Sequence, residues 1–117
     1  MRRAANLFAA LGLFLLAAAG LAADGLVAVP PLKARVTDLT GSLSREQQAS
    51  LEAELAQFEK SRGSQIAILL VPTTQPEAIE AYSIRVAEAW KLGRKGIDDG
   101  ILILVAKNDR KLRIEVG

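Results

Sequence analysis

The stretch from residue 93 to residue 117, GRKGIDDGILILVAKNDRKLRIEVG, decides the fold. It contains two runs of strand length, the continuous apolar run Ile101–Val105 and the alternating run Lys111–Val116. A continuous apolar run is typical of a strand buried on both faces, and an alternating run is typical of a strand with one wet face. A short polar link containing Asn108 and Asp109 joins the two runs. We therefore predict an antiparallel β-hairpin.

The alternating run divides into an apolar face and a charged face. Its apolar residues are Leu112, Ile114 and Val116, and its charged residues are Lys111, Arg113 and Glu115. Counting back from the turn places Ile101 about opposite Glu115, and Asp99 about opposite Gly117. Asp98, Asp99 and Glu115 are therefore expected to converge at one end of the sheet.

Upstream segments extend the hairpin into a mixed sheet. Gln65–Val71 (QIAILLV) has the length and the β-branched content of a central strand, and the apolar stripe of Ile79–Trp90 indicates a helix. The order strand–helix–strand predicts that Gln65–Val71 and Ile101–Val105 run parallel. Arg35–Leu39 fits a short edge strand. Ser44 opens an amphipathic helix with a capping box.

The predicted fold class is α/β, with a small mixed sheet made of a parallel β-α-β unit plus an antiparallel hairpin and packed with helices. Two helices cover one face of such a sheet but hardly both. We therefore expect the domain to continue beyond Gly117 and to form a three-layer sandwich when complete. The expected organisation is a leader over residues 1–23, an extended linker over 24–34 and an incomplete α/β domain over 35–117.

The first 23 residues have the layout of a secretory signal peptide. A basic head, Arg2 and Arg3, precedes an uncharged run rich in Ala and Leu, and small residues around Ala22 match what a signal peptidase reads. We predict cleavage after Ala22 or Ala23 and export to the periplasm or the outer face of the cytoplasmic membrane. The alternative is an uncleaved membrane anchor, because the uncharged run over residues 4–23 is longer than the about 17 residues that a spanning helix needs.

The composition removes several classes of chemistry. The chain has no Cys and no His, which excludes a disulfide framework, a Ser-His-Asp triad, a Cys nucleophile and an ordinary zinc site within it. Export removes Arg2 and Arg3 from the 15 Lys and Arg, which leaves 13 against 13 Asp and Glu. The mature chain is therefore neutral and has no electrostatic footprint for nucleic acid. Oxygen ligands remain for metals, and they favour Ca²⁺ or Mg²⁺.

Carboxylates supply the candidate site. Asp98, Asp99 and Glu115 would repel one another at one end of the sheet unless a divalent cation or a nearby Arg or Lys neutralised them. A divalent ion is therefore one interpretation of the acidic stretch. Because Asp-Gly is also a common turn, a purely structural role for Asp99 is the other. Asp38, at the end of its strand, has the same two interpretations.

Several of these residues together resemble a known family, the TPM domain. The resemblance rests on V-x-D-x-x-G at positions 36–41, on the capped helix and GSQIAILLV, and on W-x-L-G-x-x-G-x-D-D-G from Trp90 to Gly100 followed by the hairpin. It covers residues from about Pro31 to Gly117. The family's domain continues past the strand that ends in IEVG, which agrees with the expectation of an incomplete domain here.

The resemblance implies an exported or lumenal α/β domain, often tethered to a membrane by a later helix. Members of the family are linked to phosphatase activity, to photosystem repair in chloroplast lumens and to modulation of membrane receptors. Some bind calcium or similar cations through acidic loop residues. Carried onto this chain, the acidic pair falls on Asp98 and Asp99, with Asp38 as a further candidate.

The leading hypothesis is an envelope module that binds a divalent cation and a membrane-protein partner. Its candidate metal ligands are Asp98, Asp99, Asp38 and Glu115. The alternative is a metal-dependent phosphatase acting on phosphate monoesters, with the two adjacent aspartates holding an ion that activates water. A structural fragment without activity of its own is the third interpretation. Membrane association would come through a segment beyond Gly117 or through an uncleaved leader.

Overall fold

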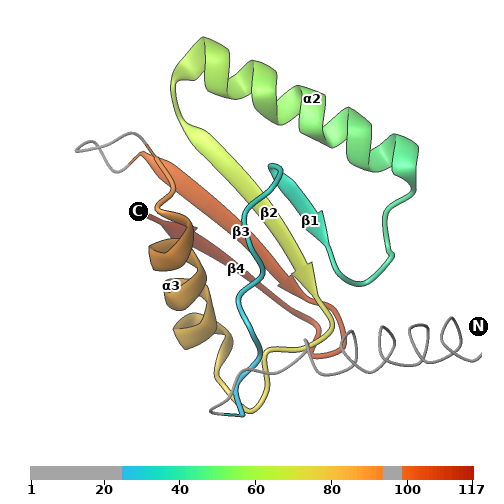
Figure 1. The fold of residues 1–117 in the computed structure, drawn as a ribbon, viewed down its shortest axis with the longest axis vertical. Coiled ribbons are helices and arrows are strands. Elements are labelled where there is room, and N and C mark those ends of the chain that lie inside the picture. The colour runs from blue at the N-terminus through green and yellow to red at the C-terminus, as the bar shows by residue number, and fades with distance from the viewer. Residues whose placement is uncertain (1–24, 94–98) are drawn as a thin grey trace, which may run out of the picture.

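A computed structural model describes residues 25–93 and 99–117 as a mixed four-stranded sheet with two helices (Figure 1). Its elements, in chain order, are β1 (Val36–Asp38), α2 (Arg45–Arg62), β2 (Gln65–Val71), α3 (Ile79–Trp90), β3 (Gly100–Ala106) and β4 (Lys111–Val116). The strand order is β1-β2-β3-β4, with β1–β2 and β2–β3 parallel and β3–β4 antiparallel. The predicted fold class, the parallel β-α-β unit and the hairpin are confirmed.

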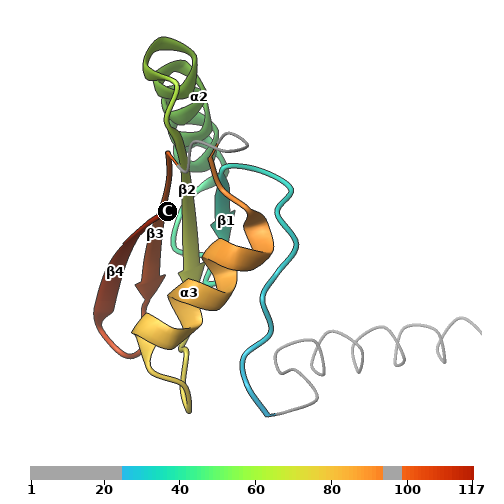
Figure 2. The ribbon, with the colours of Figure 1, turned by 90° about the vertical axis from the view of Figure 1, so that its left-hand side faces the viewer.

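The core lies between α3 and one face of the sheet. Leu69 of β2 and Leu104 of β3 are fully buried partners in the register, and Tyr82 and Val86 of α3 are fully buried in the same apolar cluster. Figure 2 shows α3 in front of the strands, with α2 behind them at the top. This is the packing that the apolar stripe of α3 predicts, because the stripe repeats at the helical period.

The helix α2 belongs to the other side of the sheet and contacts β1 and β2. The predicted capping box is present, with the Gln47 main-chain nitrogen donating to the Ser44 hydroxyl. The helix ends at Gly63, whose φ of 84° is the left-handed conformation that favours glycine. No residue of α2 is fully buried, whereas Val36 of β1 is almost completely enclosed.

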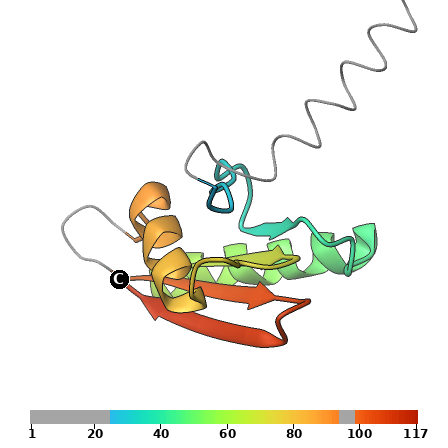
Figure 3. The same cartoon turned by 90° about the horizontal axis from the view of Figure 1, so that it is seen from below.

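The hairpin register differs from the prediction by one residue. Ile101 pairs with Val116, and Glu115 pairs with Leu102. Because side chains alternate along a strand, a shift of one residue moves a side chain to the opposite face of the sheet. Glu115 therefore shares the face of buried Leu102, toward α3. The apolar residues of β4 lie on the opposite face and are exposed to solvent instead of buried. Leu112 is 61%, Ile114 55% and Val116 66% exposed. Figure 3 shows β4 at the outer edge of the sheet, away from β1.

The segment before β1 is fastened to α3. Three side chains of α3 donate hydrogen bonds to its main-chain carbonyl oxygens. The Tyr82 hydroxyl donates to Ala28 at 2.9 Å, the Trp90 indole to Pro30 at 2.7 Å and the Arg85 guanidinium to Val27 at 2.9 Å. Residues 27–30 thus form part of the folded unit.

No helix among the described residues has both the length and the apolarity that crossing a bilayer requires. The predicted leader, residues 1–23, lies outside the described part of the chain.

Alkaline pH is expected to weaken the fold through Tyr82, the only tyrosine in the chain. Burial raises the pKa of Tyr82 from 10.0 to about 12, so between these values the unfolded chain ionises before the folded chain does. The stability linked to Tyr82 is therefore complete below pH 10 and is lost as the pH rises toward about 12. Denaturant unfolding across this range measures the loss. Tyr82→Phe is expected to lower the free energy of unfolding by about 1 kcal/mol at neutral pH. Because phenylalanine does not ionise, the variant should lack the part of the alkaline loss of stability that comes from Tyr82. If both proteins lost stability equally as the pH rises, the prediction would be wrong.

Candidate functional site

The acidic loop, defined here as residues 93–100, joins α3 to β3 and carries the Asp98-Asp99 pair. Asp98 lies outside the described residues, whereas Asp99 is described at the end of the loop. Both ends of the loop are held by Gln65, the first residue of β2. The Gly93 main-chain nitrogen donates to the Gln65 side-chain oxygen at 2.8 Å, and the Gln65 main-chain nitrogen donates to the Asp99 carbonyl oxygen at 3.3 Å.

Two glycines let the ends of the acidic loop meet. Gly93 has a φ of 96°, and a Cβ added to it would lie 2.7 Å from the Gly100 main-chain nitrogen. A Cβ added to Gly100 would lie 2.6 Å from the Gly93 main-chain nitrogen and would also overlap the Leu92 backbone. Real Cβ atoms do not approach main-chain atoms this closely, so only glycine fits at either position. The two described ends of the acidic loop therefore lie against each other, and we call this contact the stem of the loop.

Asp38 has a structural role at the end of β1. Its Oδ1 accepts hydrogen bonds from the Thr40 main-chain nitrogen at 2.9 Å and from the Thr40 hydroxyl at 2.6 Å, and its Oδ2 accepts one from the Leu43 main-chain nitrogen at 2.8 Å. Burial alone would raise the pKa of Asp38, but the hydrogen bonds from Thr40, Leu43 and Ser42 bring it below its ordinary value. The carboxylate thus organises the turn that leads into α2.

Glu115 turns toward α3. Its Oε1 accepts a hydrogen bond from the Ser83 hydroxyl at 2.9 Å and one from the Arg113 guanidinium at 3.2 Å. The Glu115 side chain is only 18% exposed. This pairing joins the edge strand β4 to the helix that covers it.

The structure does not bring together the three predicted ligands that it describes, Asp38, Asp99 and Glu115. Asp38 pairs with Leu70 near the far end of β2, whereas Asp99 adjoins Gln65 at the near end. Gln65 and Leu70 are five positions apart along β2, which is a distance of about 16 Å. Within residues 25–93 and 99–117, no three acidic side chains gather closely enough to hold a metal ion. The Asp98-Asp99 pair stays a prediction, since Asp98 is outside those residues.

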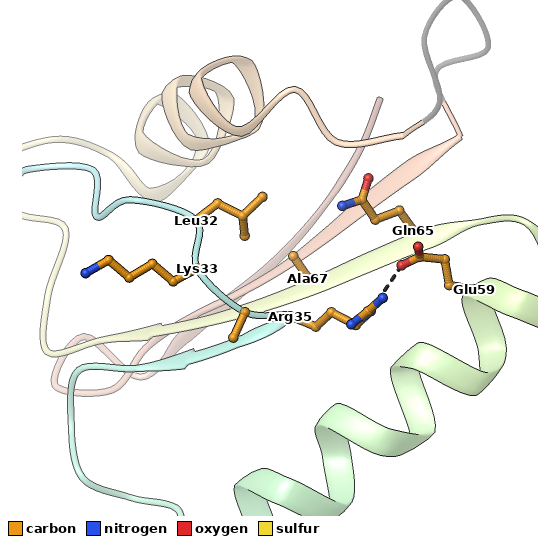
Figure 4. A pocket seen from close by; sticks show the side chains of 7 residues that line it. Leu32, Lys33, Arg35, Glu59, Gln65 and Ala67 are labelled. Carbon is orange, nitrogen blue, oxygen red and sulfur yellow. Dashed lines mark hydrogen bonds and ion pairs between the residues drawn. The ribbon is translucent and has the colours of Figure 1, made fainter.

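A hollow of about 230 Å³ lies next to the stem of the acidic loop (Figure 4). It is lined by Leu32, Lys33, Ala34, Arg35, Glu59, Gln65 and Ala67. The Arg35 guanidinium donates to Glu59 at 3.1 Å and to Glu52 at 3.2 Å, and hydrogen bonds with these two carboxylates raise the pKa of Arg35 above its usual range. Because this charge is satisfied within the chain, we assign the hollow no ligand.

Two residues with central roles were missed by the sequence analysis. Gln65 holds both ends of the acidic loop, and Glu52 accepts hydrogen bonds from the main-chain nitrogens of Arg35 and Val36, at 3.0 Å each. Neither residue has a local signal, because each partner of Gln65 or Glu52 is 16 or more positions away in the chain. The glycines at 93 and 100 did have a signal, since two glycines bracketing a short charged segment favour a tight loop.

Comparison with known proteins identifies the family and supports the fold described above. The model of the TPM domain family matches residues 36–117. The N-terminal domain of a P. gingivalis protein, solved by NMR, is 26% identical with a TM-score of 0.63, and the match covers 70% of this chain and 52% of that one. The N-terminal domain of a Corynebacterium glutamicum protein, also solved by NMR, is 19% identical with a TM-score of 0.62 and shares the fold; the match covers 79% of this chain and 60% of that one. No curated protein matches.

The fold and the described ends of the acidic loop thus define a small α/β domain with a mixed sheet, in which two glycines bring the end of α3 against the start of β3. The chain belongs to the TPM domain family. It spans about half to three fifths of the length of the two solved domains it resembles.

Proposed function

We propose that this chain is an exported envelope module that binds a divalent cation, Ca²⁺ or Mg²⁺, through its acidic loop and binds a membrane-protein partner. The observation that carries the cation part is the stem of the acidic loop. Gln65 and the two glycines hold its described ends together, which fixes where the loop leaves and rejoins the fold. Loops held in this way commonly carry binding residues.

The proposed ligand set is narrower than the set predicted from the sequence. Asp38 and Glu115 already accept hydrogen bonds within the fold, and moving either carboxylate to an ion would break those bonds. The proposal keeps Asp98 and Asp99, on which the family resemblance places the acidic pair, together with carbonyl oxygens of the same loop. A hard cation suits adjacent carboxylates because it offsets their mutual repulsion.

Calcium is expected to stabilise the mature chain through the acidic pair. At a free concentration ten times its Kd, a ligand that binds only the folded state adds about 1.4 kcal/mol. Thermal unfolding with and without Ca²⁺, repeated with Mg²⁺, measures this gain. The gain should vanish in the double variant Asp98→Asn/Asp99→Asn and persist in Glu54→Gln, which changes an exposed carboxylate on α2. A gain of equal size in the double variant would remove the acidic loop from the proposal.

The enzyme alternative, a metal-dependent phosphatase, is favoured by the matched family model, which carries the word phosphatase in its name. In that case the ion would activate a water molecule for attack on a phosphate monoester. The same preparations, assayed on a generic phosphate ester, separate the two functions. Turnover that disappears in both Asp98→Asn and Asp99→Asn would favour the enzyme, and turnover that survives both changes would point to a contaminant.

A further inference from the structure

The hairpin turn between β3 and β4 carries a local excess of positive charge. Three exposed basic residues lie in it, here called the basic turn: Lys107, Arg110 and Lys111. The carboxylate of the same turn, Asp109, is held by β2-side groups, because it accepts hydrogen bonds from the Thr73 hydroxyl at 2.8 and 2.9 Å and from the Thr74 main-chain nitrogen at 3.1 Å. Three cations and one carboxylate leave residues 107–111 with a net charge of +2.

Arg110 occupies a position at which glycine would be easier to accommodate. Its φ is 54°, in the left-handed region, which glycine enters without a steric cost and arginine does not. The Arg110 main-chain nitrogen donates to the Lys107 carbonyl oxygen at 3.2 Å, and any residue except proline could supply this bond. The shape of the turn therefore does not require arginine, and what the side chain adds is its charge.

The first described residues of the chain reach the same end of the sheet as the basic turn. The Val27 carbonyl oxygen accepts a hydrogen bond from Arg85, and Arg85 pairs with Glu77 at 2.8 Å. The Glu77 main-chain nitrogen donates to the Thr74 carbonyl oxygen at 3.0 Å, and Thr74 in turn donates to Asp109 of the turn. In Figure 1 the described chain begins at the end of the molecule that also holds the loop from β2 to α3 and the hairpin turn.

The predicted leader ends only a few residues before this fixed point. The uncharged run ends at Ala23, and four positions separate it from Val27. Four extended residues span at most about 14 Å. While a leader occupies the membrane, which it does before cleavage and continues to do if it is not cleaved, Val27 is therefore within about 14 Å of the lipid surface. The end of the sheet that carries the basic turn is the end nearest to the membrane.

We propose that the carboxyl end of the parallel strands faces the membrane, with the basic turn on the phosphates of anionic lipids. Each Lys or Arg near an anionic surface strengthens binding about fivefold, so the three together contribute about a hundredfold. Such a contribution is weak as a sole anchor, but it orients a domain that a leader already holds at the surface, since stable attachment takes two signals. The inference rests on the envelope location in the proposed function and does not depend on the cation.

This orientation separates the two charged ends of the domain. The described ends of the acidic loop lie at the amino end of β2 and β3, where Gln65 pairs with Gly100. A strand of seven residues places them roughly 23 Å farther from the lipids than the basic turn. That distance exceeds the screening length of about 8 Å at physiological salt. The acidic pair is thereby kept away from headgroups of the same charge.

The test uses the full chain, expressed with its leader and recovered from the envelope fraction. Its binding to vesicles that contain phosphatidylglycerol is compared with its binding to vesicles of phosphatidylcholine alone. Lys107→Glu/Lys111→Glu should reduce the preference for the anionic vesicles by about twentyfold or more. The control Lys60→Glu/Arg62→Glu makes the same change in net charge in the last turn of α2, next to the start of β2, and should change the preference by less than about twofold.

Arg110→Gly separates a lipid contact from a structural role in the turn. The variant should bind anionic vesicles about fivefold more weakly, while its stability in denaturant unfolding stays equal or rises, because glycine relieves the left-handed conformation. The orientation is read from amide NMR signals in nanodiscs whose headgroups carry a spin label. Signals of residues 73–77 and 107–111 should broaden, and those of residues 60–65 should not.

Four outcomes would overturn the proposal. They are an unchanged preference in Lys107→Glu/Lys111→Glu, an equal loss in Lys60→Glu/Arg62→Glu, broadening of residues 60–65 instead of the turn, and competition by glycerol phosphate at the phosphate concentration of the vesicles. The third would reverse the orientation, and the fourth would indicate a soluble anion as the ligand. Cell fractionation tests the envelope location separately, and loss of the calcium response with retained vesicle preference would remove only the cation half of the proposed function.

Discussion

Replacing Gly100 with alanine is expected to destabilise the chain by about 3 kcal/mol and to open the stem of the acidic loop. The added Cβ would lie 2.6 Å from the Gly93 main-chain nitrogen and 2.5 Å from the Leu92 Cβ. These neighbours belong to the chain leaving α3, so they cannot move aside by a change of rotamer. Either β3 or the end of α3 has to shift, and each of them packs in the core.

Gly41→Ala is the matched control for this substitution. Gly41 has a φ of 67° and no heavy atom near the position of an added Cβ, so its cost is limited to the left-handed conformation, about 1 to 2 kcal/mol. Gly100 is constrained by the atoms that crowd the position of an added Cβ, and not by its φ. Denaturant unfolding compares the two stabilities, and calcium titration follows the site. A Gly100→Ala protein with unchanged stability and an unchanged calcium response would contradict the closed stem.

Glu52→Ala is expected to cost about 3 kcal/mol, although Glu52 is a half-buried charge on a polar helix. Its carboxylate accepts hydrogen bonds from the main-chain nitrogens of Arg35 and Val36 at 3.0 Å each, and from the Arg35 guanidinium at 3.2 Å. Alanine would leave these donors without their acceptor beside Val36, which is only 1% exposed. The attachment of β1 to α2 would weaken as a result.

Glu54→Ala tests whether this cost belongs to the hydrogen bonds or to the loss of a helical carboxylate. Glu54 is exposed on the same helix, and substitutions at such positions usually change stability by no more than about 0.5 kcal/mol. Glu52→Gln, which retains one acceptor oxygen, should fall between the two. Equal stabilities of Glu52→Ala and Glu54→Ala in denaturant unfolding would show that Glu52 does not hold β1.

The candidate site was predictable only in part. The D-D-G sequence and its glycines located the acidic loop, because turn chemistry is a property of neighbouring residues. The grouping of Asp38 and Glu115 with that loop was not supported by the geometry. Asp38 instead closes its own turn through Thr40 and Leu43, and Glu115 pairs with Ser83. A carboxylate at a strand end can coordinate an ion, accept hydrogen bonds within a turn or accept one from a neighbouring helix. The sequence pattern is the same in all three cases.

The sequence by itself determined the elements of this protein. The 3.6-residue period of α3, the apolar run of β3 and the alternation of β4 each specify local structure through side-chain spacing, and the capping box of α2 locates its start. Tertiary structure alone decided which face each side chain occupies. A register of Ile101 against Val116 rather than Glu115 reverses the two faces of β4, because the side-chain period of a strand is two residues. That single step places Glu115 against α3 and turns Leu112, Ile114 and Val116 to the other face.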